Sequence, residues 1–411
     1  MIALLLEVNG ITMYRTGVQH TQAATGSQTS LREANRARVV GAVQQHGSLT
    51  QVELAGITGL SPASVSNIVT ELADAGILDT SPSIRSGRRA RLVTLARSIG
   101  VVAGIDVGAR SMSVALADTS MRILATETLP LAPDHRADMS LQRAAMLVHE
   151  LVESVDASAD ELLAVGVGVP VPVDVSSGMV SSTSLLLGWD GAAVADVLAT
   201  VLRAPAAVDN HANLGALAEA RYGAGVGRDP VVYVSVSHTM SAGIVVDGKL
   251  LHGRRGAAGE LGHMIVDERG AVCRCGNRGC LETVAGSAAL LRMLSVSHGH
   301  LTLDDVIARG LDGDPGCQRA IADTGRSLGA AIATVCNLID PDIVVIGGDL
   351  VASGELLLAP LREAVQHNTL ASSSGYADVV AAEFGREAEL RGTLAAALDR
   401  ARALGVLGVI S

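Results

Sequence analysis

The chain has 411 residues, of which 48% are hydrophobic, 18% charged and only 1% aromatic, so it is long enough for two or more packed domains. This composition excludes an intrinsically disordered protein, because such chains have too few apolar side chains to build a core. The formal net charge of −11 argues against a chain that is basic throughout, as a protein coating nucleic acid would be.

The five cysteines argue against an extracellular protein held together by disulfides. Their number is odd, and three of them, Cys273, Cys275 and Cys280, lie within eight positions. The apolar run 1–6 is too short to span a membrane and has neither a basic leader nor a cleavage site. We therefore expect a reducing, cytoplasmic setting without a membrane partner. Residues 1–30 are polar and turn-rich after that run, which predicts a disordered leader.

The segment 31–97 carries start and stop signals for short helices. Apolar residues at helical spacing predict a first helix over 31–45. A second helix begins after Thr50, because the Thr50 hydroxyl and the Glu53 carboxylate three residues later form a capping-box pattern. Gly59 ends this second helix.

The third predicted helix, 61–75, opens with a Ser-Pro cap and follows the second helix after a tight glycine turn. This order is typical of a helix-turn-helix, in which the amino end of the later helix enters the major groove of DNA. Its exposed face would carry small polar side chains and one amide that can read an adenine edge. We expect the DNA contacts of this helix at Ser61, Ala63, Ser64, Ser66 and Asn67.

A basic hairpin is predicted to follow, with two short strands, 77–78 and 92–95, flanking an arginine-rich tip. Such a wing would place Arg85, Arg88 and Arg89 against the phosphates or in a minor groove of double-stranded DNA. The N-terminal module holds eight arginines and five acids, so it is basic within an acidic chain. The alternative is a helical bundle with a solvated basic loop.

Beyond the hairpin the sequence changes to Gly- and Val-rich strands that alternate with Ala-rich helices. Buried strands are predicted over 101–108, 163–170, 231–236 and 342–348, and helices over 213–222 and 325–338. Alternation of this kind is typical of an α/β fold, and the length of the segment predicts two α/β lobes.

Two neighbouring motifs give the body a family resemblance. Gly259-Glu-Leu-Gly-His263 is followed by Cys273-Arg-Cys-Gly-Asn-Arg-Gly-Cys-Leu-Glu282. Over residues 31–411 the chain resembles the ROK family, named for repressors, open reading frames and kinases, and is similar to its xylose- and N-acetylglucosamine-type repressors. The resemblance implies a two-lobed, actin-like (ribonuclease H-like) sugar-kinase body behind the winged helix-turn-helix.

The second motif and the histidine ten residues upstream of it have the donor set of a structural zinc site. The thiolates of Cys273, Cys275 and Cys280 and the His263 imidazole make a closed tetrahedral set. No position is left for a water molecule, which argues against metal catalysis. The alternative is three free buried thiols and a core histidine.

The family resemblance carries sugar binding onto Asn210, Glu260, His263 and Glu282. Carboxylates are usual acceptors for the hydroxyls of a sugar, and the zinc loop would fix their positions. Taken singly, each of these residues could instead be a surface or capping residue.

The resemblance also divides the chain into units. We expect a leader over 1–30, a DNA-binding domain over 31–97, a first lobe over 98–211 plus 388–411, and a second lobe over 212–387. The second lobe would hold the zinc loop and the sugar site.

The phosphate-handling loops depart from those of the family's kinases. The kinases carry Asp-x-Gly-Gly-Thr after the first strand, a turn that brings backbone amides to phosphate, whereas this chain reads Asp106-Val-Gly-Ala-Arg-Ser111. The second loop, Gly-Thr-Gly-Ile-Gly in the kinases, falls on the glycine-free stretch 237–241. His211 stands where the kinases have an aspartate base, and Val171 replaces a glycine near the sugar. Because phosphoryl transfer depends on holding phosphates, these changes predict a protein that is not an enzyme.

These features predict a sugar-responsive transcriptional repressor of carbohydrate uptake or metabolism genes. Sugar would close the lobes, change the spacing of paired helix-turn-helix modules and lower operator affinity. Two operator half-sites need two recognition helices, so we expect a homodimer or a homotetramer. Two alternatives remain open: an ATP-dependent sugar kinase with an appended DNA-binding domain, and a repressor released by a partner protein.

Overall fold

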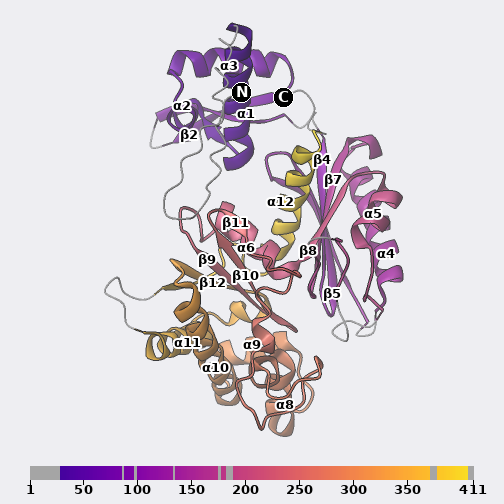
Figure 1. Ribbon diagram of the computed structural model, residues 1–411, viewed down its shortest axis with the longest axis vertical. Helices are drawn as coiled ribbons and strands as arrows, with labels where there is room; N and C mark the ends of the chain where they lie inside the picture. The colour runs from indigo at the N-terminus through magenta and orange to yellow at the C-terminus, as the bar shows by residue number, and fades with distance from the viewer. Residues whose placement is uncertain are drawn as a thin grey trace, which may run out of the picture.

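The computed structural model describes residues 28–85, 88–96, 100–132, 135–174, 177–181, 188–370 and 377–405. These residues form a small N-terminal domain and two lobes, each lobe built on a five-stranded sheet (Figure 1). The arrangement agrees with the winged helix-turn-helix and two-lobed α/β body predicted from the sequence. Residues 1–27 of the predicted leader lie outside the described residues, and the first helix starts at Gln28, slightly before the predicted boundary.

The N-terminal domain packs three helices against an antiparallel sheet. The helices are α1 (Gln28–His46), α2 (Gln51–Thr58) and α3 (Pro62–Asp74). The strands β1 (Leu49–Thr50), β2 (Leu78–Arg85) and β3 (Arg88–Leu95) pair in the order β1-β3-β2. The two hairpin strands extend well beyond their predicted apolar ends, because backbone pairing needs no apolar side chains.

The helix boundaries of this domain follow the predicted caps. The Thr50 hydroxyl accepts from the Glu53 N–H, and the Glu53 carboxylate accepts from the Thr50 N–H at 2.7 Å, so the capping box is confirmed. Gly59 ends α2 at φ 68°, in the left-handed region that favours glycine. The Ser61 hydroxyl accepts from the Ser64 N–H at 3.1 Å and so begins α3 as predicted.

The first lobe is a mixed sheet covered on both faces. Its strands are β4 (Val101–Val107), β5 (Ser111–Asp118), β6 (Ile123–Pro130), β7 (Leu162–Val169) and β8 (Ala206–Asn210), in the order β6-β5-β4-β7-β8. The helices α4 (Ala137–Ser154) and α5 (Val194–Leu202) share one hydrophobic core with this sheet. The C-terminal helix α12 (Ala388–Ala403) packs with β4, β5 and β7 in another.

The second lobe repeats this plan. Its sheet has the order β11-β10-β9-β12-β13 and consists of β9 (Val231–Val236), β10 (Met240–Val246), β11 (Lys249–Leu250), β12 (Ile343–Gly347) and β13 (Asp378–Ala381). The helix α6 (His211–Tyr222) packs on one face. The other face carries α7 (Leu281–Ala285), α8 (Ser287–His298), α9 (Leu303–Leu311), α10 (Pro315–Ile339) and α11 (Glu355–Asn368).

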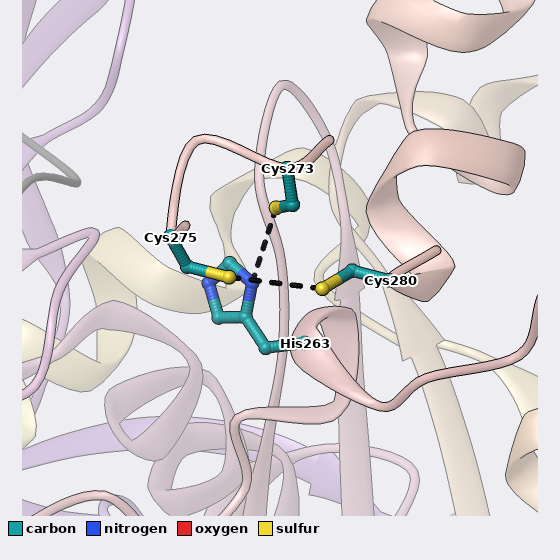
Figure 2. Close-up of side chains that lie close together, drawn as sticks. All are labelled: His263, Cys273, Cys275 and Cys280. Atoms are coloured by element: carbon teal, nitrogen blue, oxygen red, sulfur yellow. Dashed lines mark hydrogen bonds between the residues drawn. The ribbon is translucent and has the colours of Figure 1, made fainter. Parts of the chain in front are cut away.

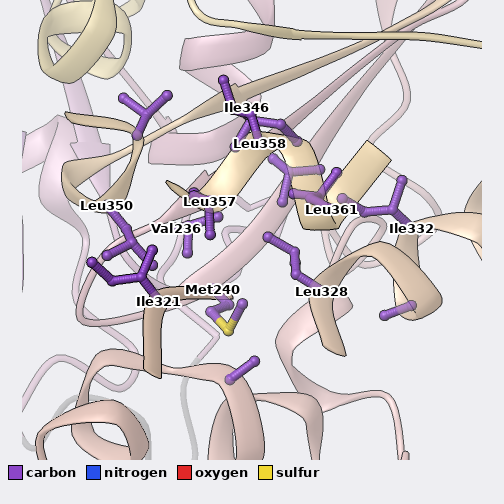
Figure 3. Close-up of a cluster of buried hydrophobic side chains, with 14 of the residues drawn as sticks. Val236, Met240, Ile321, Leu328, Ile332, Ile346, Leu350, Leu357, Leu358 and Leu361 are labelled. Atoms are coloured by element: carbon purple, nitrogen blue, oxygen red, sulfur yellow. The ribbon is translucent and has the colours of Figure 1, made fainter. Parts of the chain in front are cut away.

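The largest core lies under these five helices. Leu328 and Ile332 of α10 and Leu357 of α11 approach Val236 and Ile346 from the sheet (Figure 3). All five side chains are buried, so this face of the sheet rests on a closely packed core. No described helix, α10 included, has both the length and the apolarity needed to cross a bilayer.

The two lobes meet where α6 and α12 cross. A side chain at Gly392 of α12 would collide with the backbone carbonyl of Leu214 in α6, so only glycine allows the helices to come this close. An ion pair between Arg221 and Asp399, with N and O 2.7 Å apart, ties the same two helices. The chain therefore passes between the lobes at a tightly packed junction.

Candidate functional site

Four side chains that the sequence predicted to bind metal lie together in the second lobe. The Cys273 sulfur is 3.6 Å from Nδ1 of His263, and the sulfurs of Cys275 and Cys280 are 3.7 Å apart (Figure 2). All four ligand atoms lie within 4.8 Å of one another. We call this set the cysteine cluster; it can hold a metal ion.

The loop that carries the cysteine cluster is folded by short-range backbone pairing. Isolated bridges join Ile265 to Cys280 and Val272 to Arg278, which brings the two ends of the loop together. Gly279 has φ 69°, and a side chain there would collide with the carbonyl of a neighbouring turn. The glycine inside the motif is therefore required for the bend.

The donor set and spacing of the cysteine cluster fit a tetrahedral ion. Zinc about 2.3 Å from sulfur and about 2.0 Å from nitrogen would separate its ligand atoms by roughly 3.5–3.8 Å. The separations of 3.6 Å and 3.7 Å fall in that range. Burial and the neighbouring thiols raise the pKa of Cys280 to about 12, and a bound cation would reverse this by stabilising the thiolates.

Two of the predicted sugar carboxylates lie beside the cluster. Oε2 of Glu260 is 3.8 Å from Nε2 of His263, the ring nitrogen that does not face the sulfurs. Burial and the charge of Glu282 raise the pKa of Glu260 to about 7. Glu282 is held by the guanidinium of Arg274, with Nε 2.9 Å from Oε1, and accepts from the Met240 N–H at 3.4 Å. The structure thus brings Glu260, His263 and Glu282 together.

The fourth predicted sugar residue, Asn210, lies at the start of α6, where its side-chain oxygen accepts from the Ala212 N–H at 2.8 Å. Its neighbour His211 is linked to Glu282 through the loop before β10. Nε2 of His211 is 3.5 Å from Oγ1 of Thr239, and the next residue, Met240, contacts Glu282. Asn210 therefore caps α6, and its part in a sugar site stays a prediction.

Sequence reasoning missed Asp209, which organises the start of α6. Its carboxylate accepts from Nδ2 of Asn213 at 2.8 Å and lies 2.7 Å from Nε2 of His252. Nothing in the local pattern marks it, since His252 is 43 positions away. Oδ1 of Asn213 and Oγ of Ser241 are buried without a hydrogen-bond partner among the described residues.

Each of the two loops that would hold phosphates in a kinase has a backbone N–H that donates within the loop. The Gly108 N–H donates to the Ser111 carbonyl at 2.8 Å in the first loop. In the second, the Ser237 N–H donates to the Thr239 carbonyl at 3.1 Å, and the Ser237 hydroxyl accepts from the Asp349 N–H at 2.8 Å. Amides already engaged in this way are not free to bind a phosphate oxygen.

His211 is buried between the two loops. Its Nδ1 is 4.0 Å from Oδ1 of Asp106, an oxygen that is buried and has no hydrogen-bond partner among the described residues. Burial lowers the pKa of His211 to about 4, so the imidazole is neutral near pH 7. Burial raises the pKa of Asp106 well above its usual range, and the charges of Glu389 and Asp349 add to the effect.

Glu389 is a second buried acid that sequence reasoning missed. Its Oε1 accepts from the Tyr233 hydroxyl at 2.7 Å and from the Ser235 hydroxyl at 2.8 Å. Burial raises the pKa of Glu389 despite these two hydrogen bonds. It lies on α12 and its partners lie on β9, so the contact crosses from one lobe to the other.

The predicted DNA-reading face lies on the surface of the N-terminal domain. Ser61, Ala63, Ser66 and Asn67 are exposed, and Ser64 is half-buried. The side chains of the wing residues Arg85, Arg88 and Arg89 lie outside the described residues. Their contribution to DNA binding stays a prediction.

Two of the eight arginines in this domain have a packing role that a charge count cannot reveal. Arg32 and Arg36 of α1 pair with Glu71 of α3 at 2.9 Å and 3.2 Å. The Arg32 guanidinium lowers the pKa of Glu71. These two arginines therefore make ion pairs between α1 and α3.

The fold and site define a class of protein in which a winged helix-turn-helix is joined to a sugar-kinase-like body. The ROK family model matches residues 102–400, and the MarR family model matches residues 33–89. The chain belongs to the ROK family, and the recognition and the fold class predicted from the sequence are confirmed.

Curated relatives match over most of the chain. It is 28% identical over 360 residues to the xylose repressor of Caldicellulosiruptor bescii, which covers 84% of this chain and 90% of that protein. It is 29% identical over 365 residues to the DNA-binding transcriptional dual regulator NagC of Escherichia coli K12, covering 85% and 88%.

Solved structures divide between the two branches of the family. A ROK family transcriptional regulator, homologous to the Escherichia coli MLC protein, covers 92% of this chain and 99% of its own at 26% identity, with a TM-score of 0.71. A ROK family glucokinase from Streptomyces griseus, solved with glucose and AMPPNP, covers 73% and 100% at 28% identity, with a TM-score of 0.65. The regulator extends over the N-terminal domain as well, since it covers more of the chain.

Proposed function

We propose that this protein is a sugar-responsive transcriptional repressor of carbohydrate uptake or metabolism genes and that it has no kinase activity. One observation carries the proposal: a single chain joins an exposed recognition helix, α3, to a body in which Glu260, His263 and Glu282 lie together beside the cysteine cluster. The whole-length similarity to named repressors supports it.

In this function zinc fixes the sugar site. Nδ1 of His263 and the three sulfurs would bind the ion, which leaves Nε2 of His263 facing Glu260. A metal-bound histidine is held in one orientation and one tautomer, so it can meet a sugar hydroxyl in a fixed geometry. Glu260 and Glu282 would accept hydrogen bonds from neighbouring hydroxyls of the ring, and Asn210 would close the edge.

The signal has a physical route to the DNA-binding domain. Sugar that bridges the Asn210 edge and the second-lobe carboxylates would change the angle at the α6–α12 crossing. The N-terminal domain abuts the first lobe, where an atom added at Gly47 would lie 3.6 Å from the Ser120 carbonyl. Movement of the lobe would therefore displace the domain and, in a homodimer or homotetramer, change the spacing of two recognition helices.

The absence of kinase activity follows from the loops. ATP phosphates need backbone N–H groups and a cation, whereas the Gly108 and Ser237 amides donate within their own loops. The base position is occupied by His211, whose pKa of about 4 makes it a weak proton acceptor at neutral pH. The competing function, an ATP-dependent sugar kinase with a DNA-binding domain, is supported by the likeness to the glucokinase.

A fluorescence-anisotropy titration onto DNA from upstream of the protein's own gene tests the proposal. The full chain should bind this duplex tightly and a scrambled duplex weakly at the same salt concentration. One sugar of a panel of mono- and disaccharides should release it without ATP. Release that requires ATP would support the kinase, and binding that no sugar disturbs would support release by a partner protein.

A further inference from the structure

A cleft of about 900 Å³ lies between the two lobes, and we call it the interlobe cleft. Its walls come from the turn after β4, the start of α6, the loop before β10 and the starts of α9 and α12. Five carboxyls line it, those of Asp106, Asp304, Asp349, Glu387 and Glu389. Since a cleft interrupts the packing between its walls, the position of one lobe against the other depends on contacts at its margins.

One such contact is made by the loop 252–258, which follows β11 in the second lobe. The Ala258 N–H donates to the His252 carbonyl at 3.1 Å and closes the loop on itself. Gly256, at φ 71°, lies directly against the backbone of the first lobe, because a side chain there would collide with the Val173 carbonyl. The loop therefore joins the second lobe to the first.

The far end of the loop fixes the position of Glu260. The Ala242 N–H of β10 donates to the Gly259 carbonyl at 2.6 Å, and a side chain at Gly259 would collide with the Ala242 carbonyl. Gly259 immediately precedes Glu260. The carboxylate that we propose to bind sugar is therefore placed by the same short segment that contacts the first lobe.

The near end of the loop contacts the first lobe through a charged pair. Nε2 of His252 is 2.7 Å from Oδ2 of Asp209, which lies near the end of β8. Oδ1 of Asp209 accepts from the Asn210 N–H at 2.7 Å and from Nδ2 of Asn213 at 2.8 Å. One carboxylate therefore joins the start of α6 to the loop that leads to Glu260.

Protonation of the imidazole strengthens this contact. The hydrogen bond to Asp209 of β8 raises the pKa of His252, partial burial opposes the shift, and the Leu250 carbonyl of β11 adds to it. The side chains of His252 and Asp209 are only 28% and 16% exposed, so water screens the pair in part. A charge-assisted hydrogen bond is roughly twice as strong as a neutral one. The contact is therefore strongest below the raised pKa and weakens as the pH rises through it.

We propose that the Asp209–His252 pair is a latch between the lobes, which holds Asn210 in register with Glu260 and makes effector binding depend on the protonation of His252. The inference rests on the proposed function, because it concerns the regulation of the same sugar site. With the latch closed, both halves of the site are in place before sugar arrives, and less ordering is needed on binding. With the latch open, the apparent affinity falls by the fraction of molecules whose halves are apart.

Calorimetric titration of the full-length protein from about pH 6 to about pH 8.5 tests the latch. The probes are the mono- and disaccharides of the operator-release panel, with xylose, N-acetylglucosamine and glucose among them. His252→Gln keeps a hydrogen-bond donor near the position of Nε2 but cannot gain a charge. The dissociation constant of this variant should exceed that of the wild type about fivefold near pH 6, and the ratio should fall toward one as the pH rises. Taking the ratio removes the titration of Glu260, which both proteins share.

A second variant and a matched control make the result specific to the pair. Asp209→Asn should also weaken binding most at low pH, and adding it to His252→Gln should cost little more, because the pair is already broken. His367→Gln makes the same chemical change at an exposed histidine of α11 and should follow the wild type at every pH. Thermal unfolding shows which variants keep the fold, so the ratio is read on at least one folded protein.

The outcomes separate the latch from the proposed function. Sugar binding with a ratio that is constant over the pH range overturns the latch alone. A merely structural role of His252 gives that result, since it weakens binding equally at every pH. Failure of the wild type to bind any sugar of the panel overturns the proposed function and the latch with it.

Discussion

The cysteine cluster and the interlobe cleft lie on either side of Met240, yet they have opposite chemistry. In the cysteine cluster, four ligand atoms lie within 4.8 Å of one another and can hold a cation. In the interlobe cleft, the Gly108 and Ser237 N–H groups donate within their own loops, and five carboxyls line the walls. In the proposed function, side chains in two short loops would remove phosphate handling from a sugar-kinase-like body and leave the neighbouring sugar site in place.

Loss of one cysteine should abolish metal binding by the cysteine cluster. Of the variants considered, it should have the largest effect on stability. Cys275→Ser should lose the bound metal and lower the free energy of unfolding by at least about 3 kcal/mol, because a structural metal contributes directly to folding. Elemental analysis and chemical denaturation measure the two quantities. Cys336→Ser, at a buried cysteine of α10 outside the cluster, should keep the metal and cost about 1–2 kcal/mol. Purified wild-type protein without stoichiometric zinc would contradict the metal assignment.

Removing the charge of Glu260 should separate sugar sensing from DNA binding. Glu260→Gln should weaken the effector about 10- to 100-fold, since a carboxylate acceptor to a hydroxyl is lost, and leave operator affinity unchanged. Glu268→Gln, an exposed acid of the same loop region, is the control and should respond to sugar as the wild type does. A Glu260→Gln protein released at the wild-type sugar concentration would remove this carboxylate from the site.

The wing should contribute affinity without sequence preference. Arg88→Ala combined with Arg89→Ala should weaken operator and scrambled DNA alike by about tenfold and reduce the slope of log affinity against log salt by about 1.8. Arg292→Ala, on α8 in the second lobe, should change neither quantity. An unchanged salt slope in the double variant would mean that the hairpin does not touch phosphate.

The smallest expected effect concerns ADP release by the interlobe cleft, because we expect no phosphoryl transfer there. Wild-type protein should release no ADP above background with any sugar, and Ala109→Gly should stay inactive because the Gly108 amide still donates to Ser111. A coupled ADP assay with the zinc-loaded protein measures this. Phosphorylation of any sugar at an ordinary enzymatic rate would show that the cleft has kept its function.

Local signals in the sequence predicted the parts of the molecule that local geometry builds. The Thr50–Glu53 capping box, the Ser61 cap and the cysteine cluster each depend on residues close in the chain, and each is where the spacing placed it. Glu389 was missed because its partner Tyr233 is 156 positions away and one acid in an Ala-rich helix carries no pattern. The pairing of Arg32 with Glu71 was missed for the same reason, since the two residues lie 39 positions apart. Long-range pairing of polar side chains therefore sets the limit of what the sequence reveals.

Calorimetric titration of the zinc-loaded, full-length protein with the effector sugar and with a non-hydrolysable ATP analogue tests the central claim most directly. We expect the sugar to bind at one site per chain and the nucleotide to give no heat of binding, with or without magnesium and sugar. Nucleotide binding that strengthens when sugar is present would contradict it, because the cleft would then still hold phosphates beside an occupied sugar site.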